Sequence, residues 1–283
     1  MSTATADVSK RRAWVMAARP QTLPAGSAPV IVGAGLALHT VEFAALPWLA
    51  ALVGALLIQI GTNFANDYYD AVNGADTDDR EGFTRVTAGG LIPPKQVKYA
   101  MAATYGLSVL IGIYLVALGG VPILVVGLTS IAAGILYTGG PYPYGYRGLG
   151  DLFVFVYFGV VAVTGTYYVQ AVAAANVGLF PMWIPDGIGL ATAATASLPA
   201  AGLSTAILVV NNVRDRETDA ATGKRTLAVM LGYRFSRIEF LALVGMAYVV
   251  PVLFALDGDF GPLALAPLLS LPLAASVSKT VLE

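Results

Sequence analysis

Long apolar runs alternate with short polar stretches along almost the whole chain. A transmembrane α-helix needs roughly 20 consecutive apolar residues, and runs of about that length recur throughout the 283 residues. We mark eight such segments, at approximately 20–39, 44–65, 97–118, 121–139, 151–173, 188–211, 238–256 and 262–280. This pattern predicts an all-α fold, a polytopic transmembrane bundle of eight helices.

The composition supports a protein that uses lipid as its main solvent. Hydrophobic residues make up 57% of the chain and charged residues only 12%, whereas a soluble domain would need roughly twice that share of charge. The net charge of -1 argues against nucleic acid as a partner. The absence of cysteine excludes disulfides, thiolate catalysis and thiolate metal sites.

The predicted spans place the Lys and Arg residues on one face of the membrane. With a cytoplasmic N-terminus and eight crossings, all 16 Lys and Arg residues lie at or near the cytoplasmic face. The connections on the opposite face contain acidic residues and His39, but no Lys or Arg. This separation follows the positive-inside rule. We therefore predict a multi-pass protein of a prokaryotic cell (inner) membrane, with its N-terminus and long polar loops in the cytoplasm.

Small residues are frequent inside the apolar segments, for example Gly106, Gly112 and Gly134. Such residues allow helices to approach closely where lipid supplies no hydrophobic drive for association. No low-complexity linker divides the chain, so we expect one domain over 1–283. Residues 1–13 are expected to form a disordered cytoplasmic tail.

Polar side chains mark the end of the second apolar segment. Asn63, Asp67 and Asp70 are four and three residues apart, so they share one face of a helix. Asn66 lies in the same run, and Asp76 follows in the adjoining loop. Ionisable groups at a membrane edge are functional candidates. The simpler alternative is that these acids are solvated charges at the membrane surface.

A second cluster ends the sixth apolar segment. Asn211, Asp215 and Asp219 are spaced four and four, and therefore also share a helix face. Asn212 lies beside them. Both clusters end helices at the same membrane surface, so the two helices are predicted to place their carboxylates opposite one another around a central cavity, with the active site on its cytoplasmic side.

Crowded carboxylates repel one another unless a cation compensates their charge. Oxygen ligands without nearby Cys or His suit Mg²⁺ rather than zinc. Mg²⁺ usually leaves room for phosphate oxygens, and two such ions can clamp one diphosphate. Basic residues follow each cluster, among them Arg85 and Lys224, and would bind the oxygens that the metals leave free. We therefore predict two Mg²⁺ ions.

At these residues the chain resembles the UbiA-type intramembrane prenyltransferases, and within them the 1,4-dihydroxy-2-naphthoate branch of menaquinone synthesis. The resemblance rests on four ordered motifs: RPQTLP at 19–24, NFANDYYDAVNGAD at 63–76, YTGGPYPYGYRGLGD at 137–151, and NNVRDRETD at 211–219 followed by GKRTLAVMLG at 223–232. Together they cover about residues 14–240. This family has nine spanning helices, so we expect that a final helix is missing after Glu283.

The resemblance implies transfer of a polyprenyl group from polyprenyl diphosphate to an aromatic acid. In the naphthoate branch the acceptor loses its carboxyl group as CO₂, giving demethylmenaquinone. The implied catalytic and metal-binding residues are Asp67, Asp70, Asp76, Asp215 and Asp219. The implied substrate-binding residues are Asn63, Asn66, Arg85, Asn211, Asn212 and Lys224.

A short cytoplasmic loop carries several tyrosines and an arginine, including Tyr137, Tyr144, Tyr146 and Arg147. One interpretation is an aromatic belt at the membrane interface with turn residues. The other is a lid or an acceptor site, with Arg147 contacting the carboxylate. Tyr168 matches the family inside the fifth segment, where it is a candidate substrate contact or a helix-packing hydrogen bond.

Two other functions are compatible with parts of the pattern. An enzyme of the same fold would use another acceptor, such as 4-hydroxybenzoate or a glycerol lipid. A cation transporter or channel would use the acids as an ion pathway, but would need ionisable groups in the outer half as well. The sequence determines neither the prenyl chain length nor the oligomeric state.

Overall fold

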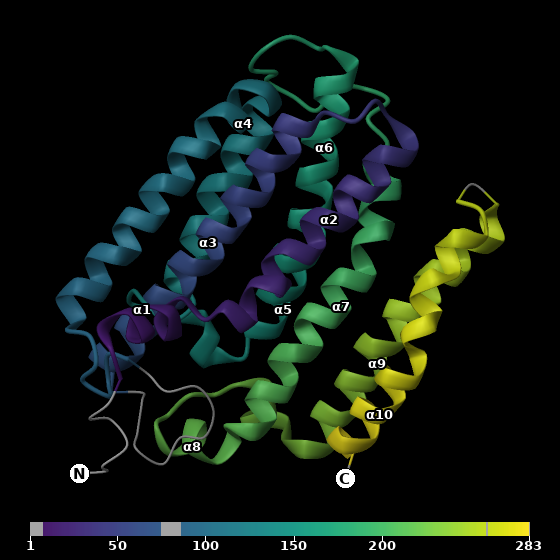
Figure 1. Cartoon of the computed structure of the whole chain (residues 1–283). Helices are drawn as coiled ribbons and strands as arrows, with labels where there is room; N and C mark the ends of the chain where they lie inside the picture. The colour runs from purple at the N-terminus through teal and green to yellow at the C-terminus, as the bar shows by residue number, and fades with distance from the viewer. Residues whose placement is uncertain (1–7, 75–85, 259, 283) are drawn as a thin grey trace.

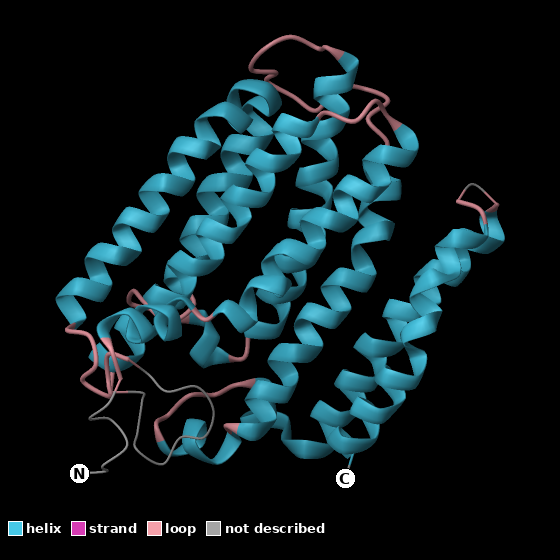
Figure 2. Ribbon diagram, in the orientation of Figure 1, coloured by secondary structure: helices cyan, strands magenta, loops and turns pink. Residues whose placement is uncertain are grey.

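The computed structural model describes residues 8–74, 86–258 and 260–282, and these residues form helices and loops without a strand (Figure 2). The α-helices are α1 Lys10–Ala18, α2 Leu23–Thr40, α3 Ala45–Val72, α4 Pro94–Leu136, α5 Gly150–Phe155, α6 Ala162–Ala175, α7 Leu190–Arg214, α8 Arg216–Ala221, α9 Leu227–Asp257 and α10 Leu271–Leu282. Four short helical segments complete them: η2 Pro20–Thr22, η3 Tyr144–Arg147, η4 Val156–Val161 and η5 Pro262–Ser270. The predicted all-α fold is confirmed.

Seven helical stretches of the described chain are long and apolar enough to cross a membrane. The difference from the predicted eight lies in α4, where Gly120 adopts φ 65° and ψ -149° and divides the element into two arms. The chain turns back at the top of the bundle (Figure 1), and a Cβ added to Gly134 in the second arm would lie 2.6 Å from the Tyr105 hydroxyl in the first. The predicted segments 97–118 and 121–139 are therefore the two arms of one helical hairpin.

The N-terminal residues differ from the prediction. α1 begins at Lys10, where the Ser9 hydroxyl accepts a hydrogen bond from the Arg12 N–H, and Ala13 and Ala17 are buried. Residues 10–13 therefore belong to a helix rather than to a disordered tail. Arg19, with φ 51°, ends α1 in the left-handed conformation, and the chain then enters α2 through η2.

The helices pack around two larger buried clusters, one near each end of the bundle, and a smaller one between α7 and α9. One includes Phe64, Met101 and Tyr105, from α3 and the first arm of α4. The other includes Tyr167 and Tyr168 of α6. At the latter end Gln170 holds the α2–α3 connection, because its side-chain amide donates to the Ala44 carbonyl at 2.9 Å and its carbonyl accepts from the Ala44 N–H at 2.8 Å.

The closest helix contacts depend on glycine, but only partly on the glycines expected. Gly159 of η4 faces α7, where an added Cβ would lie 2.1 Å from the Ala201 Cβ, and Gly134 faces Thr62 and Tyr105. An added Cβ at Gly106 or Gly112 meets nothing within 4 Å. The expectation of close packing is therefore right for Gly134 and wrong for Gly106 and Gly112, because spacing alone does not reveal which helix face meets a neighbour.

α9, η5 and α10 lie along the side of the bundle (Figure 1). α9 packs on α7, with Phe240 beside Ala206 and Val209. α10 has no buried residue. The two last predicted spans, 238–256 and 262–280, correspond to α9 and to η5 with α10.

We predict that Gly159→Ala destabilises the protein, whereas Gly106→Ala does not. The new methyl group at 159 must displace the Ala201 side of α7, and overpacking of this kind costs about 1–3 kcal/mol. Thermal unfolding in detergent of both variants measures the difference. Equal melting temperatures for the two variants would show that η4 and α7 are not in tight contact.

Candidate active site at the ends of α3 and α7

A cavity of about 260 Å³ lies where the polar ends of α3 and α7 meet the loop before α5. Asn63, Asn66 and Asp70 line it from α3. The second cluster lines it from α7 and α8 through Asn211, Asn212, Asp215 and Asp219. The two acidic clusters, far apart in sequence, therefore share one cavity.

Asn63 organises the α3 wall. It is 3% exposed, and its amide nitrogen donates to the Ala18 carbonyl and to the Thr22 hydroxyl, each at 2.9 Å. These bonds attach α3 to the break between α1 and α2. One turn further on, the Asn66 carbonyl accepts a hydrogen bond from the Thr138 hydroxyl at 3.1 Å.

Asp67 is not among the residues that line the cavity. It is 1% exposed. One carboxylate oxygen lies 3.4 Å from the Arg19 guanidinium, and the other accepts from the Thr87 hydroxyl and N–H at 3.1 and 3.3 Å. Arg19 itself lines the cavity. In this structure Asp67 holds Arg19 in the wall.

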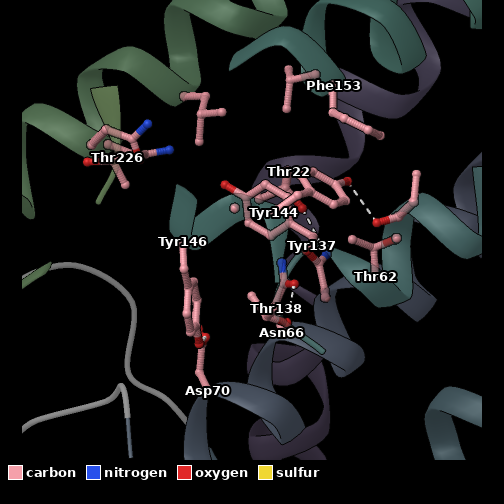
Figure 3. Close-up of a pocket in the computed structure, with 18 of the residues that line it drawn as sticks. Thr22, Thr62, Asn66, Asp70, Tyr137, Thr138, Tyr144, Tyr146, Phe153 and Thr226 are labelled. Carbon is pink, nitrogen blue, oxygen red and sulfur yellow. Dashed lines mark hydrogen bonds between the residues drawn. The ribbon is translucent and has the colours of Figure 1, made fainter. Parts of the chain in front are cut away.

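Asp70 is linked to the second cluster by a cation. The Lys224 ammonium lies 3.5 Å from Asp70 and 3.9 Å from Asp219. The Tyr146 hydroxyl donates a short hydrogen bond to Asp70, and its ring lies 4.7 Å from the Lys224 nitrogen. Tyr146 extends from the loop toward Asp70 (Figure 3). Lys224 therefore compensates carboxylates from both motifs.

Asp215 ends α7 and is 4% exposed. Arg214 donates to it through two guanidinium nitrogens, at 2.7 and 2.9 Å. Such two-point contacts are among the strongest polar interactions of a carboxylate. Burial of the acids is thus offset by charge-assisted contacts, as a water-poor site requires.

The donor atoms of this cavity fit a hard divalent cation. They are carboxylate and amide oxygens, which Mg²⁺ prefers. Within the described residues, no three His, Cys, Asp or Glu side chains are close enough to form a metal site by themselves. Mg²⁺ is commonly bound by one or two carboxylates together with substrate phosphates, so the arrangement suits a metal that arrives with, or is completed by, a phosphate ligand.

Aromatic rings form a second wall of the cavity. Tyr144 stacks on Phe153 with ring centroids 4.0 Å apart and meets Tyr137 edge-on at 5.4 Å. These rings lie together above Thr138 and Asn66 (Figure 3). Burial, together with neighbouring tyrosines, raises the pKa of the Tyr144 hydroxyl above its usual value. It therefore stays protonated, and it donates to the Ala133 carbonyl at 2.8 Å.

An apolar groove of about 340 Å³ continues from this cavity. The cavity and the groove share Ile58, Gln59, Tyr157 and Phe158 as lining residues. The walls of the groove come from α2, α3, both arms of α4, η4 and α6. Ile113 and Leu128, on opposite arms of α4, are 61% and 59% exposed. The groove is therefore open along one side of the bundle.

The structure brings most of the predicted site residues into the cavity wall. These are Asn63, Asn66, Asp70, Tyr137, Tyr144, Asn211, Asn212, Asp215, Asp219 and Lys224. Asp67 does not line the cavity but contacts Arg19, which does. Asp76 and Arg85 lie outside the described residues.

Two residues predicted to contact the substrate do not line the cavity. Arg147 is exposed and rests on the Tyr142 ring, 3.9 Å from its centroid, outside the cavity. Tyr168 is near the other end of the bundle, where its hydroxyl donates to the Gly119 carbonyl at 3.0 Å. It has the helix-packing role that was its alternative interpretation. The residue type alone does not reveal which way the side chain of Arg147 or Tyr168 points.

The predicted site did not include Arg19 or Arg214, both of which line the cavity, whereas Tyr146, which also lines it, was a candidate in the tyrosine loop. Each belongs to, or adjoins, a motif noted above: RPQTLP, the tyrosine loop and the second acidic run. A positively charged residue inside one of these motifs was therefore the sequence feature that could have identified Arg19 and Arg214 as site residues. What the sequence did not reveal is that Arg19 folds back onto α3.

Fold and site together define a polytopic α-helical membrane protein with an acidic cavity at one end and an apolar groove leading from it. The chain matches the UbiA prenyltransferase family over residues 27–282, and it belongs to that family.

The 1,4-dihydroxy-2-naphthoate octaprenyltransferase of Mycobacterium tuberculosis is 41% identical over 265 residues, covering 92% of this chain and 83% of the relative. The Escherichia coli protein of the same name is 42% identical over 231 residues, covering 80% and 70%.

Among solved structures, a UbiA homologue from Archaeoglobus fulgidus bound to DMAPP and Mg²⁺ matches with a TM-score of 0.61 at 16% identity, covering 89% of this chain and 83% of that one. A UbiA homologue from Aeropyrum pernix K1 matches with a TM-score of 0.65 at 12% identity, covering 96% and 88%. These likenesses confirm the fold.

We predict that Arg19→Gln lowers kcat/KM for prenyl transfer by about 100-fold or more, the usual loss when one preorganised charge-stabilising group is removed. Arg147→Gln is the matched control. It should change kcat/KM by less than about fivefold, because an exposed charge contributes at most about 1 kcal/mol. Steady-state kinetics of both variants test this. A large loss in Arg147→Gln with an active Arg19→Gln would reverse the assignment.

Proposed function

We propose that this protein transfers a polyprenyl group from polyprenyl diphosphate to 1,4-dihydroxy-2-naphthoate, with release of CO₂ and diphosphate, to give the quinol form of demethylmenaquinone. The observation that carries the proposal is the continuity of an acidic, cation-lined cavity with an apolar groove. A prenyl diphosphate has the same two parts, a charged head and a hydrocarbon tail. The choice of acceptor is supported by relatives of that name that are 34–42% identical to this chain.

The diphosphate head binds in the cavity and the tail in the groove. Asp70, Asp215 and Asp219 would hold the divalent metal, two Mg²⁺ ions in our proposal, with Asn66 and Asn211 as further oxygen donors. When bound, Mg²⁺ neutralises the leaving diphosphate and acts as a Lewis acid on its oxygens. Asp67, another predicted ligand, orients Arg19 in the structure described here. The fifth predicted ligand, Asp76, lies outside the described residues.

The protein's cations prepare the site for the departing charge. Arg19, Arg214 and Lys224 line the cavity, and each is paired with a carboxylate. In the complex these donors turn to diphosphate oxygens as negative charge develops on the leaving group. Preorganised donors of this kind stabilise a transition state without reorganisation of solvent.

Breaking the allylic C–O bond leaves an allylic carbocation beside the aromatic wall. The π-faces of aromatic rings attract positive charge, and Tyr144, Phe153 and Tyr157 line the cavity, with Tyr157 also lining the groove. The acceptor ring attacks the cation through the carbon that bears the carboxyl group, and CO₂ departs. The apolar surroundings exclude water that would otherwise quench the cation. No protein nucleophile is needed.

The same proposal places the reaction at the inner face of a bacterial cell membrane. Support comes from the distribution of Lys and Arg, which favours a cytoplasmic N-terminus, and from bacterial relatives. The lateral opening of the groove between the arms of α4 would let long tails enter from the bilayer. An enzyme of this fold with a different acceptor would share every feature above except the acceptor.

We predict that Asp70→Asn and Asp215→Asn each lower prenyl transfer by about 100-fold or more, because each removes a charge that stabilises the diphosphate clamp. Asp186→Asn, on an exposed loop away from the cavity, is the control. Purified protein is incubated with Mg²⁺, labelled prenyl diphosphate and 1,4-dihydroxy-2-naphthoate, and the product is weighed by mass spectrometry.

Two outcomes would contradict the proposal. Full activity of both cavity variants at saturating Mg²⁺ would reject the clamp. Product formed from 4-hydroxybenzoate or a glycerol lipid, with none from dihydroxynaphthoate, would reject the acceptor and retain the reaction class.

A second prediction concerns the tail. Gly112 lines the groove and has free space beside it, so Gly112→Phe should fill part of the groove and raise KM for a long-chain prenyl diphosphate by about tenfold, while a five-carbon donor is little affected. Gly106→Phe, on the same arm but outside the groove, is the control. Equal KM values for long and short donors in Gly112→Phe would show that the tail lies elsewhere.

A further inference from the structure

Gln59 of α3 lines both the cavity and the groove, and the reaction proposed above gives it no role. The residue is 7% exposed. Its side-chain carbonyl oxygen is buried and has no hydrogen-bond partner among the described residues. A buried acceptor without a donor is unfavourable, because it has lost its water and gained nothing in return. An oxygen of this kind in the wall of a binding site indicates a ligand that donates to it.

The hydrogen-bond network fixes which end of the Gln59 amide is unpaired. The Thr22 hydroxyl donates its one proton to the Arg19 carbonyl at 3.0 Å. It therefore accepts from the Gln59 amide nitrogen, which lies 3.0 Å away. The Asn63 nitrogen donates to the Ala18 carbonyl at 2.9 Å, so the Asn63 oxygen is the atom 3.5 Å from the Gln59 nitrogen. Because the Gln59 nitrogen faces two acceptors, the oxygen must point elsewhere.

Contacts from α2 hold the Gln59 side chain in place. A Cβ added to Gly26 would lie 3.3 Å from the Gln59 Cβ and 3.6 Å from its Cγ, so the α2 backbone packs directly on the stem of this side chain. The stem and the amide nitrogen are thus both fixed. The carbonyl oxygen is preorganised, and a preorganised group binds a ligand at a low entropic cost.

The oxygen does not belong to the metal clamp. Asp70 follows Gln59 by eleven residues on α3, which corresponds to about 16 Å along the helix axis. The acidic end of the cavity would hold the diphosphate and its metal. Gln59 lies deeper, on the side of the cavity that adjoins the groove.

Of the two substrates, only the acceptor can supply the missing donor. The oxygens of a prenyl diphosphate accept hydrogen bonds, and its hydrocarbon tail makes none. A dihydroxylated aromatic acid has two phenolic hydroxyl groups, and each can donate one hydrogen bond, as the tyrosine hydroxyl does. The unpaired oxygen of Gln59 therefore matches the acceptor and not the prenyl donor.

Resting on the proposed function, we propose that the Gln59 carbonyl accepts a hydrogen bond from a ring hydroxyl of the aromatic acceptor. This contact holds the acceptor ring beside the prenyl carbon that passes from the cavity into the groove. A site that binds a substrate hydroxyl in this way rejects an analogue without it, because the buried oxygen is then left unpaired. Gln59 is thus a specificity-determining residue for the acceptor.

The contact also assists the bond-forming step. The ring carbon that bears the carboxylate bonds to the allylic carbon, the C–O bond to the diphosphate breaks, and CO₂ leaves while its bonding electron pair returns to the ring. The hydroxyl keeps its proton. It becomes more acidic as the ring gives up electron density, so its hydrogen bond to Gln59 is strongest in the transition state.

Inhibition by two acceptor analogues tests the proposal. 1-Hydroxy-2-naphthoate and 4-hydroxy-2-naphthoate each lack one of the two hydroxyls, and the Ki of each is measured against 1,4-dihydroxy-2-naphthoate with purified full-length protein. Gln59→Met keeps the length of the side chain and removes the amide. The ratio of the two Ki values should change by about tenfold or more between the wild type and Gln59→Met.

Three further measurements separate this role from a structural one. Gln96→Met, on the exposed first turn of α4, is the matched control and should keep the wild-type ratio. Gln59→Glu should keep it too, because a carboxyl oxygen still accepts from the hydroxyl. The KM for prenyl diphosphate should change by less than about threefold in Gln59→Met, because that substrate has no donor to lose.

A Ki ratio in Gln59→Met equal to that of the wild type would overturn the proposal and assign the oxygen to a bound water. Loss of the ratio in Gln59→Glu as well would also overturn it, because the nitrogen end of the amide would then be the important one. If Gln59→Met fails to fold, the wild type decides. Binding about tenfold weaker than dihydroxynaphthoate for one analogue supports the contact, and equal affinity for all three compounds overturns it.

Failure of this inference and failure of the proposed function are separate results. A wild type that forms no product from dihydroxynaphthoate rejects the proposed acceptor. An active wild type whose Ki ratio does not depend on Gln59 rejects only the contact described here.

Discussion

The site depends on compensation of negative charge at the edge of an apolar bundle. Asp67, Asp70, Asp215 and Asp219 are each at most 4% exposed, and carboxylates so far from water are tolerated only with a cation or strong hydrogen bonds. Arg19, Arg214 and Lys224 meet this need. The same contacts fasten α1 to α3 and connect α3 to the segment after α8. The chemistry of the site and the stability of this end of the bundle therefore have a common origin.

In the proposed function, replacement of these internal contacts by a substrate explains how such a site would bind a diphosphate and release it. The charged groups are already buried and oriented, so little reorganisation is required when phosphate oxygens and metal arrive. The apolar groove supplies the rest of the binding energy through the tail, and its side opening allows a tail to leave into lipid. Under this proposal, head and tail would be recognised by different physical forces in adjoining spaces.

Contact between the helices decides which of many small residues matter. Gly134 and Gly159 let α3, α4, η4 and α7 approach one another, and Gly120 lets α4 reverse direction with a backbone conformation that other residues rarely adopt. Gly106 and Gly112 instead face open space. In lipid, where apolar side chains gain little by leaving the solvent, this close approach is a main source of helix association.

The sequence by itself determined the all-α membrane fold, the approximate positions of the spanning segments, the two acidic clusters and the oxygen-donor chemistry of the site. These follow from local properties: the length of an apolar run, and the spacing of side chains on one helix. Only the tertiary structure decided which side chains face the cavity. It turned Asp67 toward Arg19, placed Arg147 outside and moved Tyr168 to the far end, because these directions depend on how helices distant in sequence rotate and pack.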